Sequence, residues 1–157
     1  MENILGNIYC WFESIFGLNL ADHLWGFDGV AYTKPILYNT IGIIAIVISL
    51  LLVLIYYYAI NHPRFHKWWS WLIVLIFNST INLFIGYAWC INDFKNGHIA
   101  DSLRYLRDEN GEITEYLITV GDCWGFGIAN FIVSAMFFTL FSFSLKWWSS
   151  NCKYSPF

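Results

Sequence analysis

The sequence predicts an all-α integral membrane protein with three transmembrane helices. Two observations indicate this class: three long stretches carry almost no charge, and only 12% of the 157 residues are charged, about half the share usual in soluble domains. A third is the aromatic content of 21%, because Trp and Tyr favour the headgroup region of a bilayer. We expect residues 1–157 to form one membrane domain.

Residues 3–20 are expected to form an N-terminal amphipathic helix, because apolar residues recur on one side at a helical period. The apolar side comprises Ile4, Ile8, Trp11, Phe12, Ile15 and Phe16. A position in the membrane interface is favoured for this helix. Two alternatives stay open, packing on the bundle or a neighbouring subunit and crossing as a fourth span.

Residues 37–60, 68–91 and 123–148 are the three predicted spans. The first is roughly 36 Å long as a helix, which exceeds the roughly 30 Å of a hydrocarbon core. Asp122 is expected to cap the third helix after a break at Gly121. A soluble protein with buried helices is disfavoured, because three runs of this length exceed what a small core covers.

Residues 92–120 form the one sizeable polar connector, expected to lie outside the membrane. A short helix is expected near residues 100–107, and Asn110-Gly111 is the strongest short hairpin signal in the chain. Ile113, Tyr116 and Leu117 would then cap the bundle. Two interpretations are equally supported: a lid or contact surface, and a solvated connector.

The distribution of charge predicts the orientation. Four basic residues lie in the 61–67 connection (Arg64 and Lys67) or at the C-terminal tail (Lys146 and Lys153), and all eleven acidic residues lie elsewhere. The opposite side also holds four basic residues, so the two counts tie, and the density of basic residues within a few positions of span ends decides. By the positive-inside rule, we expect the C-terminus in the cytoplasm and the N-terminus outside a bacterial inner membrane. A repeated Lys-Trp-Trp-Ser sequence supplies the expected interfacial anchors, which are Lys67, Trp68, Trp69, Lys146, Trp147 and Trp148.

Polar residues at membrane depth are the first candidate site. They are Asn78, Ser79, Asn82, Asn130 and Ser134. Amides are costly in hydrocarbon unless hydrogen-bonded, so these side chains should face protein or water. Contact between helices is the favoured interpretation, and a polar path lined by several subunits is the alternative.

Cysteine and histidine give weaker signals. Cys90 and Cys123 end the second span and begin the third on the same predicted side, so they either form a disulfide in an oxidising compartment or are ordinary small residues. His62 and His66 are four apart, but Pro63 between them disfavours a metal pair. The sequence carries no catalytic motif, and we expect no enzyme activity, cofactor, metal or nucleic-acid partner.

Two functions follow as hypotheses. Three helices enclose little volume and their polar faces need partners, so a homo-oligomer in the bilayer is expected. The first hypothesis is a small homo-oligomeric channel or pore. In general layout alone it resembles the small multi-pass effectors of bacterial anti-phage defence, which permeabilise membranes. The alternative is a non-catalytic accessory or assembly subunit that docks a protein through residues 92–120 or the N-terminal helix.

Overall fold

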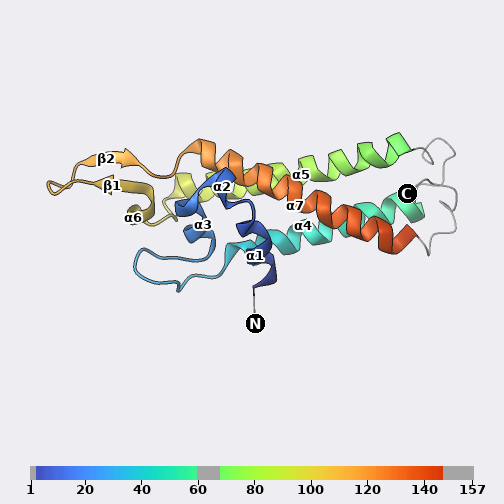
Figure 1. The fold of residues 1–157 in the computed structure, drawn as a ribbon, viewed down its shortest axis with the longest axis horizontal. Coiled ribbons are helices and arrows are strands. Elements are labelled where there is room, and N and C mark those ends of the chain that lie inside the picture. Colours follow the sequence, from blue (N-terminus) through green and yellow to red (C-terminus); the bar gives the residue numbers. More distant parts are fainter. Residues whose placement is uncertain (1–2, 60–67, 147–157) are drawn as a thin grey trace.

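A computed structural model describes residues 3–59 and 68–146. Three long helices run side by side, with a smaller head at one end (Figure 1). They are α4 (Leu37–Leu54), which a π-helical turn η1 (Ile55–Ala59) continues, α5 (Trp68–Asn96) and α7 (Val120–Lys146). All three are long and apolar enough to cross a membrane, which confirms the three predicted apolar helices.

The polar ends of two helices differ from the prediction. α5 continues five residues beyond the uncharged run, to Asn96, and α7 begins at Val120, so the predicted break at Gly121 is wrong. The reason is a cap at Thr119: Asp122 Oδ2 accepts hydrogen bonds from the Thr119 backbone N–H at 2.7 Å and the Thr119 hydroxyl at 2.9 Å. The Asp122 carboxylate thus satisfies the backbone N–H of Thr119, which lets the helix begin about one turn earlier than predicted.

The N-terminal segment forms three short helices, so the prediction of one helix over residues 3–20 is wrong. They are α1 (Ile4–Cys10), α2 (Glu13–Phe16) and α3 (Leu18–Leu24). Gly17, with φ 81°, turns the chain between α2 and α3 in a conformation that glycine adopts readily. The predicted apolar side is therefore not continuous, and two of its members, Ile4 and Trp11, are exposed.

These short helices pack on the bundle through aromatic side chains. Tyr9 of α1 stacks on Tyr38 of α4, with ring centroids 5.3 Å apart. Phe16 of α2 meets Phe126 of α7 edge to face at 5.4 Å. All four rings are fully buried. Of the three alternatives for this segment, packing on the bundle is therefore the arrangement that the structure has.

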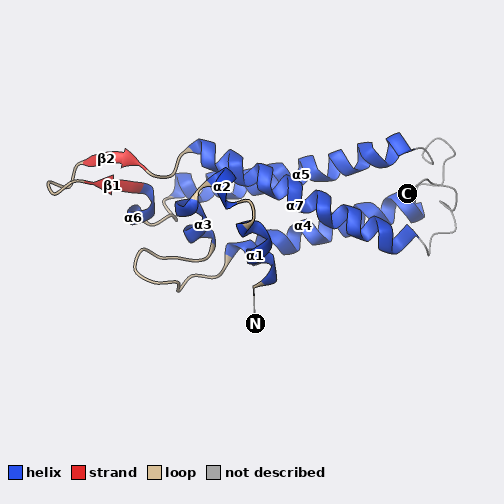
Figure 2. Ribbon diagram, in the orientation of Figure 1, coloured by secondary structure: helices blue, strands red, loops and turns tan. Residues whose placement is uncertain are grey.

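The head consists of α3, the loop of residues 25–36 and the connector of residues 97–119. Within the connector lie α6 (Asp101–Arg104) and a two-stranded antiparallel hairpin, β1 (Tyr105–Arg107) and β2 (Ile113–Tyr116), which Figure 2 shows extending beyond the bundle. Tyr105 pairs with Tyr116. The hairpin predicted around Asn110-Gly111 is confirmed.

The residues that cap the bundle are not the predicted ones. Ile113 and Tyr116 are exposed and Leu117 is half-buried, whereas Ile99, Leu103 and Ile118, at the roots of the hairpin, are buried in the main core. The hairpin points away from the bundle end, so only its roots contact the core. The apolar side chains of its two strands are therefore exposed and do not pack on the core.

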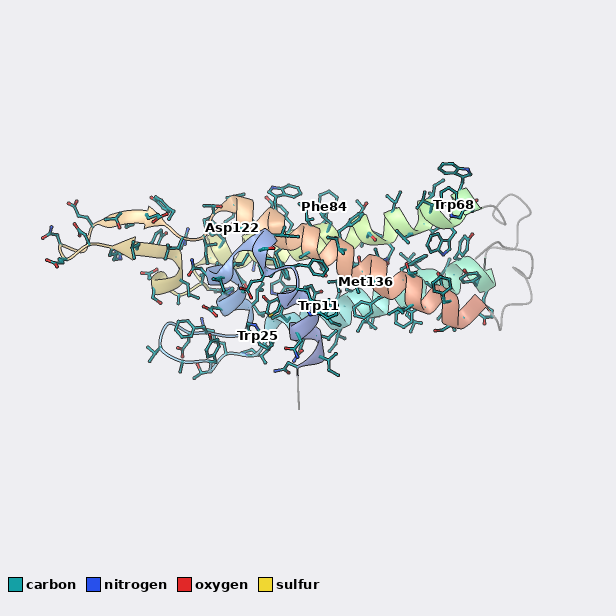
Figure 3. All side chains as sticks on the ribbon, viewed as in Figure 1. Trp11, Trp25, Trp68, Phe84, Asp122 and Met136 are labelled. Carbon is teal, nitrogen blue, oxygen red and sulfur yellow. The ribbon has the colours of Figure 1, made fainter. Side chains whose placement is uncertain are left out.

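The outward faces of the long helices are apolar. Figure 3 shows Trp68 and Phe84 of α5 pointing away from the bundle. The larger exposed side chains on these faces include Ile43, Val47, Leu51, Ile73, Phe77, Phe84, Ile128, Leu140 and Phe143. The outward faces are thus largely apolar, whereas the Asn and Ser side chains in the middle of the helices are buried; a soluble bundle has the opposite arrangement, with polar residues on its outer face.

Candidate functional site

The five polar residues predicted at membrane depth lie inside the bundle. Each of Asn78, Ser79, Asn82, Asn130 and Ser134 has a relative exposure of 0%. Together with Ser49 of α4, which is equally buried, they form what we call the polar seam. The seam lies between α4, α5 and α7 of one chain.

Hydrogen bonds join the seam into a continuous line. The Tyr9 hydroxyl donates to Asn130 Oδ1 at 2.6 Å, and Asn130 Nδ2 donates to the Asn82 carbonyl oxygen at 2.6 Å. Asn82 Nδ2 donates to the Asn78 carbonyl oxygen at 3.0 Å, and Asn78 Nδ2 donates to Ser49 Oγ at 3.1 Å. Burial raises the pKa of the Tyr9 phenol, so its proton remains available. The line ties α1, α4, α5 and α7 together.

Small residues make this line possible. A Cβ atom added to Gly86 of α5 would lie 3.1 Å from Asn130 Cβ and 3.2 Å from Asn130 Nδ2. The absence of a side chain at Gly86 therefore lets the Asn130 amide reach the α5 backbone. Close approach at small residues, with amides bonding across the contact, is the usual association mode of helices in lipid.

Three oxygen atoms in the seam have no hydrogen-bond partner among the described residues. They are Asn78 Oδ1, Ser79 Oγ and Asn82 Oδ1, all on about one turn of α5. Buried polar atoms are rarely left without a partner, and bound water commonly fills such positions. These three oxygens of α5 could therefore still accept hydrogen bonds from water.

The position of the seam changes the case for an oligomer. The polar faces were expected to need neighbouring subunits, but they meet one another within a single chain. The hydrogen bonds from Asn78 to Ser49 and from Asn130 to α5 are all intramolecular. A path lined by these residues would therefore run through one three-helix bundle unless the helices separate.

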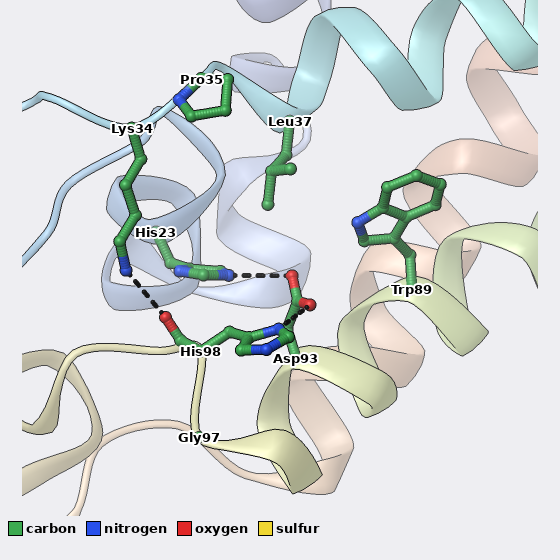
Figure 4. Close-up of a pocket in the computed structure, with 8 residues that line it drawn as sticks. All are labelled: His23, Lys34, Pro35, Leu37, Trp89, Asp93, Gly97 and His98. Carbon is green, nitrogen blue, oxygen red and sulfur yellow. Dashed lines mark hydrogen bonds and ion pairs between the residues drawn. The ribbon is translucent and has the colours of Figure 1, made fainter.

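A second polar cluster joins the head to the bundle. Asp93, in the last turn of α5, accepts a hydrogen bond from His23 Nε2 at Oδ2 (3.2 Å) and from His98 Nδ1 at Oδ1 (3.0 Å). The Lys34 ammonium donates to the His98 carbonyl oxygen at 3.0 Å. Figure 4 shows these four residues, which we call the clasp, converging from α3, α5 and the two head loops.

The clasp borders a cavity of about 510 Å³, within the range typical of small-molecule sites. Its remaining walls are largely apolar and come from Pro35, Leu37, Trp89 and Gly97. His23 is buried, and its Nδ1 atom has no partner among the described residues. Both carboxylate oxygens of Asp93 already accept hydrogen bonds from imidazoles. The clasp therefore joins α3 and the residue 98 loop to the end of α5, rather than offering a free carboxylate to a ligand.

Sequence reasoning missed the clasp. The histidines were expected at the interface or in solvent, yet His23 is buried. Asp93 is the first charged residue after the uncharged run, two positions beyond the predicted end of the second span, and His98 follows five positions later. That spacing is a usable signal, but His23 is 70 positions from Asp93 and no local pattern links them.

The predicted cysteine pair is brought together. Cys90 and Cys123 are both buried, and their thiols are within hydrogen-bonding reach of each other. Both are free thiols in the structure. Cys10, on α1, is half-buried.

Two of the predicted interfacial anchors are described. Trp68 and Trp69 are both exposed and meet edge to face, with ring centroids 4.7 Å apart. They lie at the end of the bundle opposite the head. The other four, Lys67, the Lys146 side chain, Trp147 and Trp148, lie outside the described residues.

Metal binding gains no support from the described part of the chain. There, no group of three or more His, Cys, Asp or Glu side chains is arranged to hold a metal ion. His62 and His66 lie outside the described residues.

Comparison with known proteins leaves the geometry as the guide to function. No protein-family model, curated protein or solved structure matches this chain.

Proposed function

We propose that this protein is a non-catalytic subunit of a membrane complex, anchored by its three long helices, whose hairpin docks a protein partner. The observation that carries the proposal is the exposure of the hairpin: all four residues of β2 are exposed. A two-stranded hairpin is only marginally stable by itself in water. A partner that packs on it or adds a strand would supply the missing contacts.

The hairpin carries both apolar and charged recognition features. Leu106, Ile113 and Tyr116 are exposed, Tyr116 to 63%. The hairpin and its turn carry four carboxylates and one guanidinium, so their net charge is negative. The carboxylates belong to Asp108, Glu109, Glu112 and Glu115, and the guanidinium belongs to Arg107. The fitting partner therefore presents an apolar strip with basic residues beside it.

The rest of the molecule suits an anchor. The outward faces of α4, α5 and α7 match the acyl chains of a lipid bilayer, and the seam satisfies most of its polar groups internally. The basic residues of the 61–67 connection and the tail favour a cytoplasmic location for that end. The head would then face the outside of a bacterial inner membrane.

Site-specific photo-crosslinking in cells of the source organism tests docking. A photoreactive residue replaces Ile113 in one variant and Val30 in the control, because both positions are exposed and belong to the head. We expect one crosslinked product of defined mass from position 113 only, lost when Leu106 and Tyr116 are also changed to Ser. Equal crosslinking from both positions, or none from position 113, would refute docking through the hairpin.

A homo-oligomeric channel, with membrane permeabilisation in bacterial defence as its possible role, remains the second candidate. Three oxygen atoms of Asn78, Ser79 and Asn82 have no hydrogen-bond partner within the described ranges. They favour the channel, because water would bind to this row of oxygens if the three helices moved apart. Purified protein in liposomes distinguishes the two functions. Ion conductance that Asn82→Leu abolishes would support the channel, whereas a silent membrane supports the docking subunit.

A further inference from the structure

Two buried thiols face each other where α5 and α7 enter the head. Cys90 and Cys123 have relative exposures of 1% and 0%, and their thiols are within hydrogen-bonding reach of each other. Nothing in the docking or channel function uses them. Both residues belong to the same buried cluster, so their proximity depends on the core packing of the two helices.

The two helices pack closely next to the cysteines. A disulfide requires Cα atoms about 4.4–6.8 Å apart, a separation that facing residues of closely packed helices can reach. A Cβ atom added to Gly127 of α7 would lie 3.0 Å from the Leu83 carbonyl oxygen of α5. Between Gly127 and the cysteine level, Tyr87 and Trp124 stack with ring centroids 4.2 Å apart. The two helices are therefore in tight contact up to Cys90 and Cys123.

The pair also lies at the polar end of the helices. Asp93 follows Cys90 by three residues and Asp122 directly precedes Cys123. Residues 91–122, which include the clasp residues Asp93 and His98 and the whole hairpin, form the segment that a Cys90–Cys123 bond would close. In the proposed orientation, this end meets the oxidising compartment.

We infer that Cys90 and Cys123 form a disulfide that closes the base of the head. The oxidant is a protein disulfide of the thiol oxidoreductase class. One cysteine thiolate attacks that disulfide and forms a mixed disulfide, and the second cysteine then displaces the oxidoreductase thiol. Two electrons and two protons pass from the cysteine pair to the oxidoreductase, whose disulfide becomes a dithiol. Because both sulfurs are buried in the folded chain, the exchange precedes final packing, and the completed bond resists reductants.

The inference rests on the proposed orientation but requires no partner. A variant with Cys10→Ser and Cys152→Ser retains only the two cysteines of interest. Cells are quenched in acid, and the protein is unfolded and treated with a maleimide-linked polymer before or after reduction. We expect no adduct before reduction and two adducts after it. Two adducts without reduction would overturn the inference, whether or not the hairpin crosslinks a partner.

Position around the helix is tested by moving one thiol. In the same background, Cys90→Ser with Trp89→Cys turns the thiol about 100° around α5. We expect both cysteines of this variant to react with the maleimide without reduction. Non-specific oxidation of any two nearby cysteines would instead leave both unreactive. In the same background, loss of the native bond in Cys90→Ser/Cys123→Ser should lower the melting temperature by roughly 5–10 °C relative to the Cys10→Ser/Cys152→Ser variant. An unchanged melting temperature would show that no bond constrains the head.

Discussion

Substitution of Gly125 by Ala tests how the N-terminal segment packs on the bundle. An added Cβ atom at Gly125 would lie 2.3 Å from the Ile15 carbonyl oxygen and 3.1 Å from Phe16 Cα. Because the colliding atoms belong to the backbone, α2 must move by about 0.7 Å merely to reach a 3.0 Å contact. Gly121, one turn earlier in α7, is the matched control, since its added Cβ atom meets only Thr119 Oγ1 at 3.2 Å.

The two substitutions should change stability by different amounts. Replacing a helical Gly with Ala stabilises by up to about 1 kcal/mol, and at Gly121 only the 3.2 Å contact with Thr119 Oγ1 opposes this gain. At Gly125 the same gain is opposed by overpacking, which typically costs about 1–3 kcal/mol. The free energies of unfolding of the two variants should therefore differ by about 1–3 kcal/mol, with Gly125→Ala the less stable.

Unfolding in detergent micelles, followed by circular dichroism, gives the free energies. A local measurement accompanies it: the rate at which a maleimide labels Cys10 should rise in Gly125→Ala, because α1 moves with α2. Equal stabilities together with unchanged Cys10 labelling would show that α2 does not pack on α7. The segment would then lie elsewhere, as a free interfacial helix would.

Three further results are expected. In a double-mutant cycle of Tyr9→Phe and Asn130→Leu, the coupling energy from unfolding should be about 0.5–1.5 kcal/mol, and zero coupling would contradict the 2.6 Å hydrogen bond. Asp93→Asn should lower the free energy of unfolding by about 1–3 kcal/mol, since an amide offers one acceptor to two imidazoles; an unchanged value would argue against the clasp. A hydrogen bond from the Thr33 hydroxyl, and secondly hydrogen bonds from backbone amides, lower the pKa of Asp28 to about 2. The amides of this loop should therefore be protected from hydrogen exchange above pH 4 and lose that protection as the pH falls toward 2. Loss near pH 4 instead would refute that turn.

The parts of the fold that local composition decides were predictable. An uncharged run of more than twenty residues specifies a long apolar helix whatever lies beside it. Asn110-Gly111 likewise specifies a tight turn, and Gly111 has a positive φ of 83°. The five polar residues predicted at membrane depth were expected to face inward from solvation cost alone, and all five are buried.

Features that depend on distant segments were not predictable. The period of residues 3–20 placed Trp11 on one apolar side because it assumed one unbroken helix, and the break between α1 and α2, at Trp11 and Phe12, removes that assumption. Tyr9 reaches Asn130 across 121 positions, and His23 reaches Asp93 across 70. Neither pairing leaves a spacing pattern in the sequence, because tertiary packing alone brings these residues together.

The closed seam and the apolar outward faces together bear on where a partner binds. In lipid, the hydrophobic effect does not drive helices together, so association depends on small residues or polar groups at the contact. Here Gly86 and Gly127 are already used between α5 and α7, and the outward faces present large side chains such as Ile73 and Phe84. Recognition by another protein is therefore better supported at the head, where polar backbone and exposed apolar side chains occur together, than along the three long helices.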